Sequence, residues 1–174
     1  MNSAKNLKKI KNHNNVNNLV IAAFFAAIIF LTTYLIKVPI ITGYGHIGDT
    51  FIYLAACILP SAYACSAAAI GAALADGIGG YPLYIIPSVI IKALTALMFT
   101  SKSQKIISKR NFFAFIPSIV LCAGGYYISE VILYQSFVSP VASLPRNIAQ
   151  PVLSLILFTL IGFALDKSKF KQKI

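Results

Sequence analysis

Apolar residues dominate this chain and come in long blocks, separated by short polar, glycine-rich or proline-rich segments. A block of about 20 apolar residues is long enough to cross a membrane as a helix. The blocks predict helices over residues 17–37, 50–79, 82–100, 112–134 and 147–165. The fold class predicted from this pattern is an all-α integral membrane protein.

The block over residues 50–79 is too long for a single crossing, because about 30 residues would span ~45 Å against a hydrocarbon core of ~30 Å. Pro60-Ser61 interrupts it, so it forms either one long kinked helix or two helices joined near Pro60. Six helices would place the N-terminal tail, the loop 101–110 and the C-terminus on one side, whereas five would separate them. Since all three segments are basic, the positive-inside rule predicts six transmembrane helices, with both termini cytoplasmic.

Composition agrees with a membrane protein and argues against a nucleic-acid partner. Of the 174 residues, 58% are hydrophobic and 11% are charged, whereas soluble domains carry about 25% charged residues. The net charge is +11, but most basic residues flank the apolar blocks, as expected for retention on the cytoplasmic side. We expect one domain: a basic cytoplasmic tail over residues 1–16, a six-helix membrane domain over 17–166 and a basic cytoplasmic tail over 167–174.

Residues 38–49, after the first predicted helix, form a polar and glycine-rich segment. Pro39 and three glycines make it a structured loop rather than a helix, and the topology places it outside the cell. Asp49 and Thr50 are positioned to cap the next helix, because such side chains accept hydrogen bonds from free backbone N–H groups and a carboxylate is favoured by the helix dipole.

Small residues four positions apart occur twice on the first predicted helix, as Ala22, Ala23, Ala26 and Ala27. In lipid, such pairs allow two helix backbones to approach closely. The residues therefore predict a helix contact, either within the bundle or with a partner subunit.

The outward half of the predicted bundle collects the polar and aromatic residues that could bind a small solute. Glu130 and Lys92 lie inside predicted helices, where an ionisable group is costly and needs a partner or a cavity. Lys92 could pair with Glu130 or with Asp76. Each candidate also has a structural interpretation: an ion pair for the charged groups, an aromatic belt for the tyrosines and a solvated loop residue for His46.

The sequence contains no catalytic motif, phosphate loop or metal-ligand spacing. We therefore predict no enzyme activity, no cofactor and no metal site. Cys57, Cys65 and Cys122 lie within apolar blocks, where they are expected to be buried as small apolar side chains.

Four short runs are similar to those of a known family. They are His46–Ala56 (HIGDTFIYLAA), Ala69–Asp76 (AIGAALAD), Gly79–Tyr81 (GGY) and Ile90–Leu94 (IIKAL). The chain resembles, from the first to the sixth predicted helix, the substrate-binding S component of energy-coupling factor (ECF) vitamin transporters. The nearest branch is that of the riboflavin-type and hydroxymethylpyrimidine- or pyridoxine-type members. The resemblance implies six helices, cytoplasmic termini and a vitamin site near the outer face, under the loop 38–49.

The resemblance also implies partners. The family docks its transmembrane coupling subunit through an alanine pattern on helix one, which Ala22, Ala23, Ala26 and Ala27 match, and two cytoplasmic ATPases complete the complex. The identity of the vitamin does not follow, because similar members take different vitamins. The chain has no tryptophan to stack on a ring, so tyrosines are expected to line the pocket.

We therefore expect a substrate-specific subunit of an ECF-type ABC transporter in a prokaryotic plasma membrane, which captures a small water-soluble vitamin or precursor from outside for ATP-driven uptake. The expected binding residues are Tyr44, His46, Tyr81, Tyr84, Tyr127, Glu130, Asn147 and Gln150. Among them, Glu130, Asn147 and Gln150 would hydrogen-bond the solute and His46 would belong to a lid. The alternatives are a stand-alone proton-coupled carrier that uses Glu130 and Lys92, and a membrane assembly subunit without a ligand.

Overall fold

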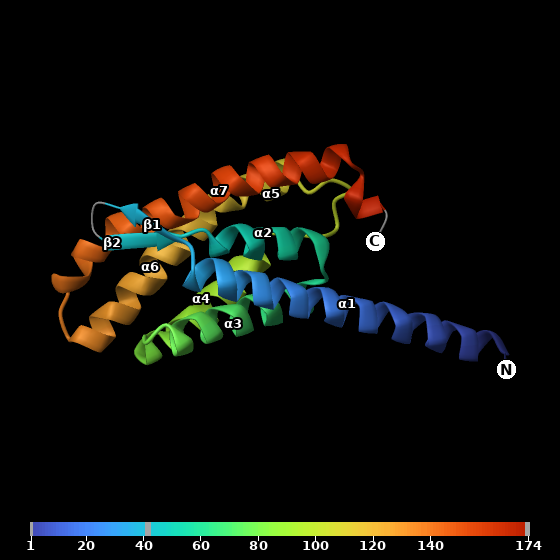
Figure 1. Ribbon diagram of the computed structural model, residues 1–174, viewed down its shortest axis with the longest axis horizontal. Coiled ribbons are helices and arrows are strands. Elements are labelled where there is room, and N and C mark those ends of the chain that lie inside the picture. Colours follow the sequence, from blue (N-terminus) through green and yellow to red (C-terminus); the bar gives the residue numbers. More distant parts are fainter. Residues whose placement is uncertain (1, 41–42, 173–174) are drawn as a thin grey trace.

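The computed structural model describes residues 2–40 and 43–172, with side chains placed for residues 15–36 and 45–171. The elements are α1 (Asn2–Tyr34), β1 (Lys37–Ile40), β2 (Gly43–His46), α2 (Gly48–Ile58), α3 (Ser61–Ile78), η1 (Pro82–Tyr84), α4 (Ile85–Met98), α5 (Lys109–Phe113), α6 (Phe115–Tyr134), η2 (Ser139–Ser143), α7 (Leu144–Lys167) and η3 (Phe170–Gln172). The long helices run side by side, and α2 lies between α1 and α7 (Figure 1). The predicted all-α membrane fold is confirmed, with one small sheet added.

Pro60 separates two helices, as the basic segments predicted. Helix α2 ends at Ile58 and α3 begins at Ser61, with Pro60 in an extended conformation between them. The carbonyl oxygen of Pro60 accepts hydrogen bonds from the backbone N–H groups of Tyr63 (3.0 Å) and Ala64 (3.1 Å), which starts α3. Proline fits this place because it lacks the N–H that a helix interior would need. The six predicted helices correspond to α1, α2, α3, α4, α6 and α7.

Strands β1 and β2 form a two-stranded antiparallel sheet with Lys37 opposite His46. The sequence predicted only a structured loop here. The sheet leads directly into α2, which has 11 residues and is therefore ~16 Å long, too short to cross a membrane alone.

Within the residues that the structure describes, four segments are long and apolar enough to cross a membrane. They are Asn15–Tyr34, Ser61–Ile78, Lys109–Tyr134 and Ser139–Lys167; two shorter apolar helices are Gly48–Ile58 and Pro82–Met98. Large apolar side chains cover the outside of the bundle, including Ile86 (71% exposed), Val120 (68%) and Leu160 (63%). Such a surface is unfavourable in water and is suited to lipid, so the protein is membrane-embedded.

The centre of the bundle is built around α2. Six consecutive residues of α2, from Ile52 to Cys57, are buried. The ring of Tyr53 stacks on Phe99 (centroids 4.6 Å apart) and meets Phe158 edge-on at 5.8 Å. Burial on every face, unlike the one-sided burial of a surface helix, places α2 in the interior, in contact with α1, α3, α4 and α7.

At the end of the bundle that carries the two chain ends (Figure 1), hydrogen bonds between side chains and the backbone join the last helix to the loop 101–110. The carboxylate of Asp166 in α7 accepts from the N–H groups of Ile106 (2.7 Å) and Ile107 (2.9 Å). Lys171 Nζ donates to the carbonyl oxygen of Ser101 at 2.6 Å. The basic loop 101–110 and the basic C-terminal segment therefore lie together, as the charge distribution predicted.

Two details differ from the sequence-based expectations. Helix α1 begins at Asn2, whereas its membrane-spanning part begins at Asn15, close to the predicted start near Asn17. The residue that caps α2 is Ile47, and neither Asp49 nor Thr50 makes a side-chain cap. Thr50 Oγ1 instead donates to the carbonyl oxygen of Ser154 in α7 (3.0 Å).

Gly71 sets the distance between α1 and α3. A Cβ atom on Gly71 would lie 2.7 Å from Ile29 Cγ2 and 2.9 Å from the carbonyl oxygen of Ala26. Ala22 and Ala26 are buried in the same seam, so small residues here form a contact within the bundle. This is one of the two outcomes that the alanine pattern allowed.

We expect Gly71→Ala to destabilise the protein by about 1–3 kcal/mol, because overpacking a tight helix contact forces the backbones apart. The measurement is thermal unfolding in detergent, followed by a maleimide dye that reacts as the buried thiols of Cys57 and Cys122 become exposed. Gly124→Ala is the matched control, since a Cβ atom there meets nothing within 4 Å. Equal melting temperatures for the two variants would contradict the close approach of α1 and α3.

Candidate solute-binding site

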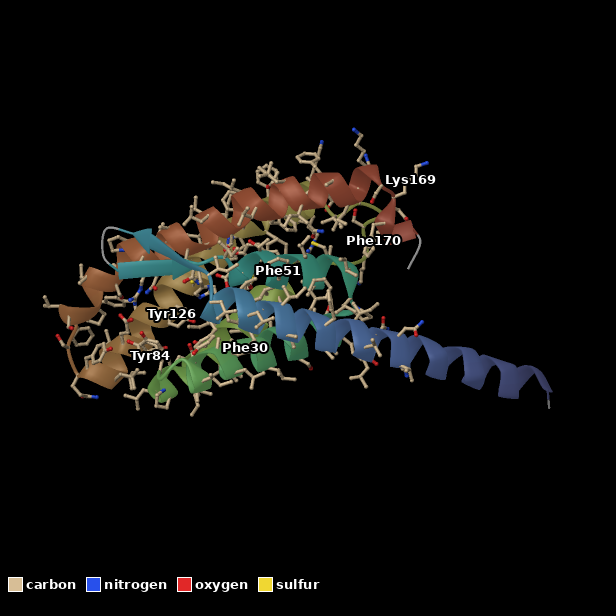
Figure 2. All side chains as sticks on the ribbon, viewed as in Figure 1. Phe30, Phe51, Tyr84, Tyr126, Lys169 and Phe170 are labelled. Atoms are coloured by element: carbon tan, nitrogen blue, oxygen red, sulfur yellow. The ribbon has the colours of Figure 1, made fainter. Side chains whose placement is uncertain are left out.

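A cavity of about 240 Å³ opens between α3, α4, α6 and α7, at the end of the bundle opposite the chain ends. Figure 2 shows Tyr84 and Tyr126 at this end. The lining residues are His46, Asp76, Tyr81, Tyr84, Ser88, Tyr126, Tyr134, Arg146, Asn147 and Gln150. Aromatic walls with a few convergent polar groups are typical of small-molecule sites, although most such sites are somewhat larger, at ~300 Å³ or more.

A buried ion pair between Asp49 of α2 and Lys92 of α4 lies behind the cavity lining, against the lining residue Gln150, and is called the floor below. Lys92 Nζ lies 2.7 Å from Asp49 Oδ1 and donates to Oδ2 at 2.9 Å, and both side chains are at most 3% exposed. Gln150 Nε2 of α7 donates to the same Oδ2 at 3.0 Å. Lys92 Nζ also lies 5.5 Å from the centre of the Tyr126 ring. Three helices thus meet at one carboxylate.

This floor corrects the interpretation of two residues. Asp49, predicted as a helix cap, has its carboxylate turned into the bundle, although it remains in the first turn of α2, where the helix dipole favours a negative charge. Lys92 pairs with Asp49, and with neither Glu130 nor Asp76. A lysine inside a membrane helix needs a counter-charge, but residues 43 positions apart give no sign of this contact in the sequence.

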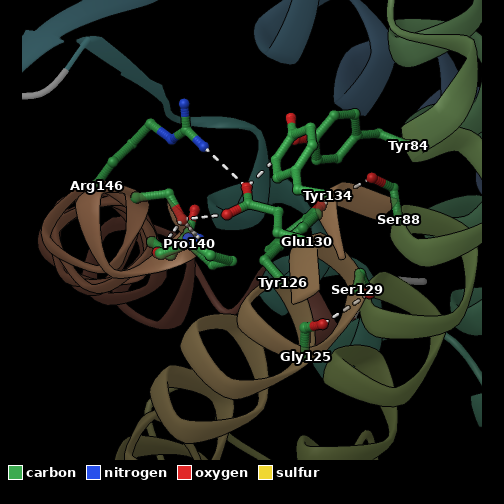
Figure 3. A network of polar contacts seen from close by, with 11 residues as sticks. Tyr84, Ser88, Gly125, Tyr126, Ser129, Glu130, Tyr134, Pro140 and Arg146 are labelled. Carbon is green, nitrogen blue, oxygen red and sulfur yellow. Dashed lines mark hydrogen bonds and ion pairs between the residues drawn. The ribbon is translucent and has the colours of Figure 1, made fainter. Parts of the chain in front are cut away.

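One wall of the cavity is supported by a second set of polar contacts around Glu130 of α6 (Figure 3). Glu130 is buried, and its Oε1 accepts from the hydroxyl of Tyr84 (3.3 Å) and from Arg146 Nη2 (3.4 Å). Its Oε2 accepts from the hydroxyl of Ser143. The hydroxyl groups of Tyr84 and Tyr134 are 2.6 Å apart. Glu130 therefore stands behind the lining residues and holds Tyr84 and Arg146 in place.

Of the eight predicted binding residues, five line the cavity, two lie elsewhere and one falls outside the described side chains. His46, Tyr81, Tyr84, Asn147 and Gln150 line it. Glu130 lies behind the wall, and Tyr127 donates its hydroxyl to the carbonyl oxygen of Phe137 (2.9 Å) away from the cavity. The side chain of Tyr44 falls outside the described residues.

The sequence-based set omitted several lining residues, namely Asp76, Ser88, Tyr126, Tyr134 and Arg146. Helical spacing could have identified Tyr126, Tyr134 and Ser88 among them. Tyr126, Glu130 and Tyr134 are four residues apart and share one face of α6, whereas Tyr127 faces about 100° away. Ser88 likewise precedes Lys92 by one turn of α4.

His46, the last residue of β2, lines the cavity. Its Nδ1 accepts from the backbone N–H of Gly48 at 3.3 Å. Desolvation lowers the pKa of His46 to about 4; Asp49 opposes this shift, and Lys92 and Arg146 reinforce it. The imidazole is therefore neutral at pH 7, and its proton is on Nε2 because Nδ1 accepts a hydrogen bond.

A second, apolar groove of about 260 Å³ lies at the seam of α1 and α3, away from this cavity. Ala22, Ala23 and Ala26 line it from α1, together with small residues of α3 such as Ala62 and Ser66. Ala22 and Ala26 are buried, whereas Ala23 and Ala27 are exposed. Two of the four alanines therefore contribute to a contact inside the bundle, and the other two lie on the surface.

A polar cavity at one end of a membrane-embedded helix bundle is typical of a membrane protein that binds a solute from the aqueous phase. The family model described as ECF-type riboflavin transporter, S component, matches residues 13–167. The chain belongs to this family, and is therefore a substrate-specific subunit of a vitamin transporter. This family is one of transporters and not of enzymes. A search of the curated proteins finds no match.

Removing one partner of the floor ion pair should destabilise the fold strongly. We expect Lys92→Met to cost about 3–5 kcal/mol of stability, because it leaves the Asp49 carboxylate buried without a counter-charge. The double variant Asp49→Asn/Lys92→Met should recover part of this loss, and Lys105→Met, an exposed lysine of the inner loop, serves as the control. Thermal unfolding in detergent measures all three, and a Lys92→Met protein as stable as the control would refute the role of the pair.

Proposed function

We propose that the protein captures riboflavin, or a closely related flavin, from outside the cell and presents it for ATP-driven uptake. The observation that carries this proposal is the tyrosine- and amide-lined cavity in a chain that belongs to the riboflavin-type S components. Tyr81, Tyr84, Tyr126 and Tyr134 offer aromatic faces to a planar ring system. Asn147 and Gln150 offer amide groups that can pair with the imide edge of a flavin.

The position of the cavity supports binding from outside. The basic loop 101–110 and the C-terminal segment lie at the opposite end of the bundle, and such segments stay on the cytoplasmic side. The sheet of β1 and β2 would act as the lid, since His46 reaches the cavity from its second strand.

Energy for uptake would come from partner proteins. The sequence contains no phosphate-binding loop, so ATP hydrolysis is assigned to two cytoplasmic ATPases that act through a transmembrane coupling subunit. The apolar groove of α1 and α3 is the docking surface proposed for that subunit. A proton-coupled carrier is less well supported, because Lys92 and Glu130 are each engaged in an ion pair rather than free to exchange protons.

Flavin binding can be measured directly in detergent from the quenching of riboflavin fluorescence. We expect the intact protein to quench it and Asn147→Ala to weaken binding about tenfold, since a hydrogen bond made inside the cavity is lost. Tyr127→Phe is the control, because its hydroxyl points away from the cavity. Failure of the intact protein to bind riboflavin would end the flavin assignment.

The docking surface can be tested apart from binding. We expect Ala23→Leu to leave riboflavin binding unchanged and to abolish uptake by cells, because a bulky side chain would fill the exposed side of the groove. Ala164→Leu, at another exposed alanine, on α7, is the matched control. Normal uptake by Ala23→Leu would place the coupling subunit on another face.

A further inference from the structure

The loop that joins α6 to α7, at the cavity end of the bundle (Figure 1), presents an apolar surface away from the cavity. Phe137 is 75% exposed and Val138 is 80% exposed. No charged residue lies between Glu130 and Arg146, whereas the segment 101–110 at the other end of the bundle carries four basic residues. Large apolar side chains that are exposed together mark a surface that contacts a membrane or another protein.

The length of α6 places this loop at the boundary of the hydrocarbon core. The 20 residues of α6 rise ~30 Å, which matches the ~30 Å core of a bilayer. The start of α6 follows Lys109 and Arg110 of α5, so its other end reaches the opposite headgroups. Ile128 and Ile132 are exposed on the last turns of α6, and they continue the lipid-facing surface of the bundle up to the loop.

The polar groups of the loop are engaged by the loop and by α6. Ser136 Oγ accepts from the backbone N–H groups of Val138 (3.3 Å) and Ser139 (3.2 Å). The hydroxyl of Tyr127 donates to the carbonyl oxygen of Phe137 at 2.9 Å, which gives Tyr127 a role outside the cavity. Backbone groups that lack an internal partner are costly next to lipid, and these hydrogen bonds remove part of that cost.

The end of α6 is closed in the same way. The last carbonyl groups of a helix have no partner within it, and Gln135 Nε2 donates to one of them, the carbonyl oxygen of Ile132, at 2.7 Å. The N–H of Val141, another exposed apolar residue, donates to the carbonyl oxygen of Val138 at 3.1 Å. The chain thus supplies hydrogen bonds that water would supply in a solvated loop.

We propose that residues 135–143 anchor the cavity end of the bundle in the lipid leaflet that surrounds it. Phe137, Val138 and Val141 insert between the lipid chains at the level of the headgroups. Two observations favour lipid as the partner: the apolar surface continues that of α6, and the polar groups behind it are paired within the protein. Insertion does not depend on which solute the cavity binds, so it stands apart from the flavin assignment.

The same loop is joined to the wall of the cavity. Ser143, its last residue, donates to Glu130, and Glu130 holds Tyr84 and Arg146. Lipid on one side of the loop and the cavity wall on the other therefore set the height of the cavity in the membrane. The mouth of the cavity lies at the level of the headgroups rather than above them.

The chain contains no tryptophan, so a single introduced tryptophan reports on its own surroundings. Phe137→Trp and Val138→Trp are made in the full chain, which is placed in nanodiscs of phosphatidylcholine and phosphatidylglycerol. Quenching is measured with acrylamide in the water and with lipids brominated either near the headgroup or near the end of the acyl chain. The matched controls are Gln104→Trp, in the exposed basic loop, and Ile128→Trp, on α6 about 9 Å from its outer end.

We expect both loop variants to emit at shorter wavelength than Gln104→Trp and to be quenched several-fold less by acrylamide. Bromine near the headgroup should quench them more than bromine near the chain end, and Ile128→Trp should show the opposite order. Adding Ser136→Ala to Phe137→Trp should raise acrylamide quenching several-fold, because two N–H groups lose their acceptor and turn to water.

Acrylamide quenching of both loop variants equal to that of Gln104→Trp would place the loop in water and overturn the proposal. Protection from acrylamide without quenching by either lipid would indicate a protein cover, such as a second copy of the chain, and would overturn it as well. An unchanged signal on adding Ser136→Ala would refute the internal hydrogen bonds as the reason for insertion. Either loop position decides the outcome if the other variant does not fold.

Discussion

The end of the bundle that contains the cavity depends on one buried ion pair, between Asp49 and Lys92. Charges placed among apolar helices need partners, and this pair meets that need while joining α2 to α4. Gln150 adds α7 through the same carboxylate. The helices that surround the cavity are therefore fixed to one another beneath it, and the lining residues above have defined positions before any ligand arrives.

The arrangement of helices could be predicted from the sequence, because it depends on features that lie along the chain. The break at Pro60 followed from the length of the apolar block and the side on which the basic segments must lie. The sheet of β1 and β2 could not be predicted, because its strands are only four residues long and contain glycine and proline, which are uncommon in strands.

The candidate site could be predicted only in part, because some of its features lie along the chain and others depend on contacts between distant segments. Which outward residues gather at one end follows from topology, and His46, Tyr84 and Gln150, which were predicted to bind the solute, do line the cavity. The partners of Asp49 and Glu130 come from segments distant in the sequence, so the sequence could not show them. Asp49 was predicted as a helix cap and Glu130 as a ligand contact, and the structure places both in ion pairs. Tyr126 lines the cavity, whereas the hydroxyl of Tyr127, which was predicted to contact the solute, donates to the carbonyl oxygen of Phe137.

The continuity of the chain from the sheet into α2 has a kinetic consequence. His46, at the end of β2, and Asp49, on the floor, are separated by two residues, and one of them, Gly48, is packed so closely against Thr33 that a Cβ atom would lie 2.0 Å from its Oγ1. Lifting the sheet away from the cavity would therefore pull directly on the helix turn that carries the buried carboxylate. Entry and escape of the solute would be limited by the rate at which this linked segment moves, so a ligand held weakly at equilibrium could still leave slowly.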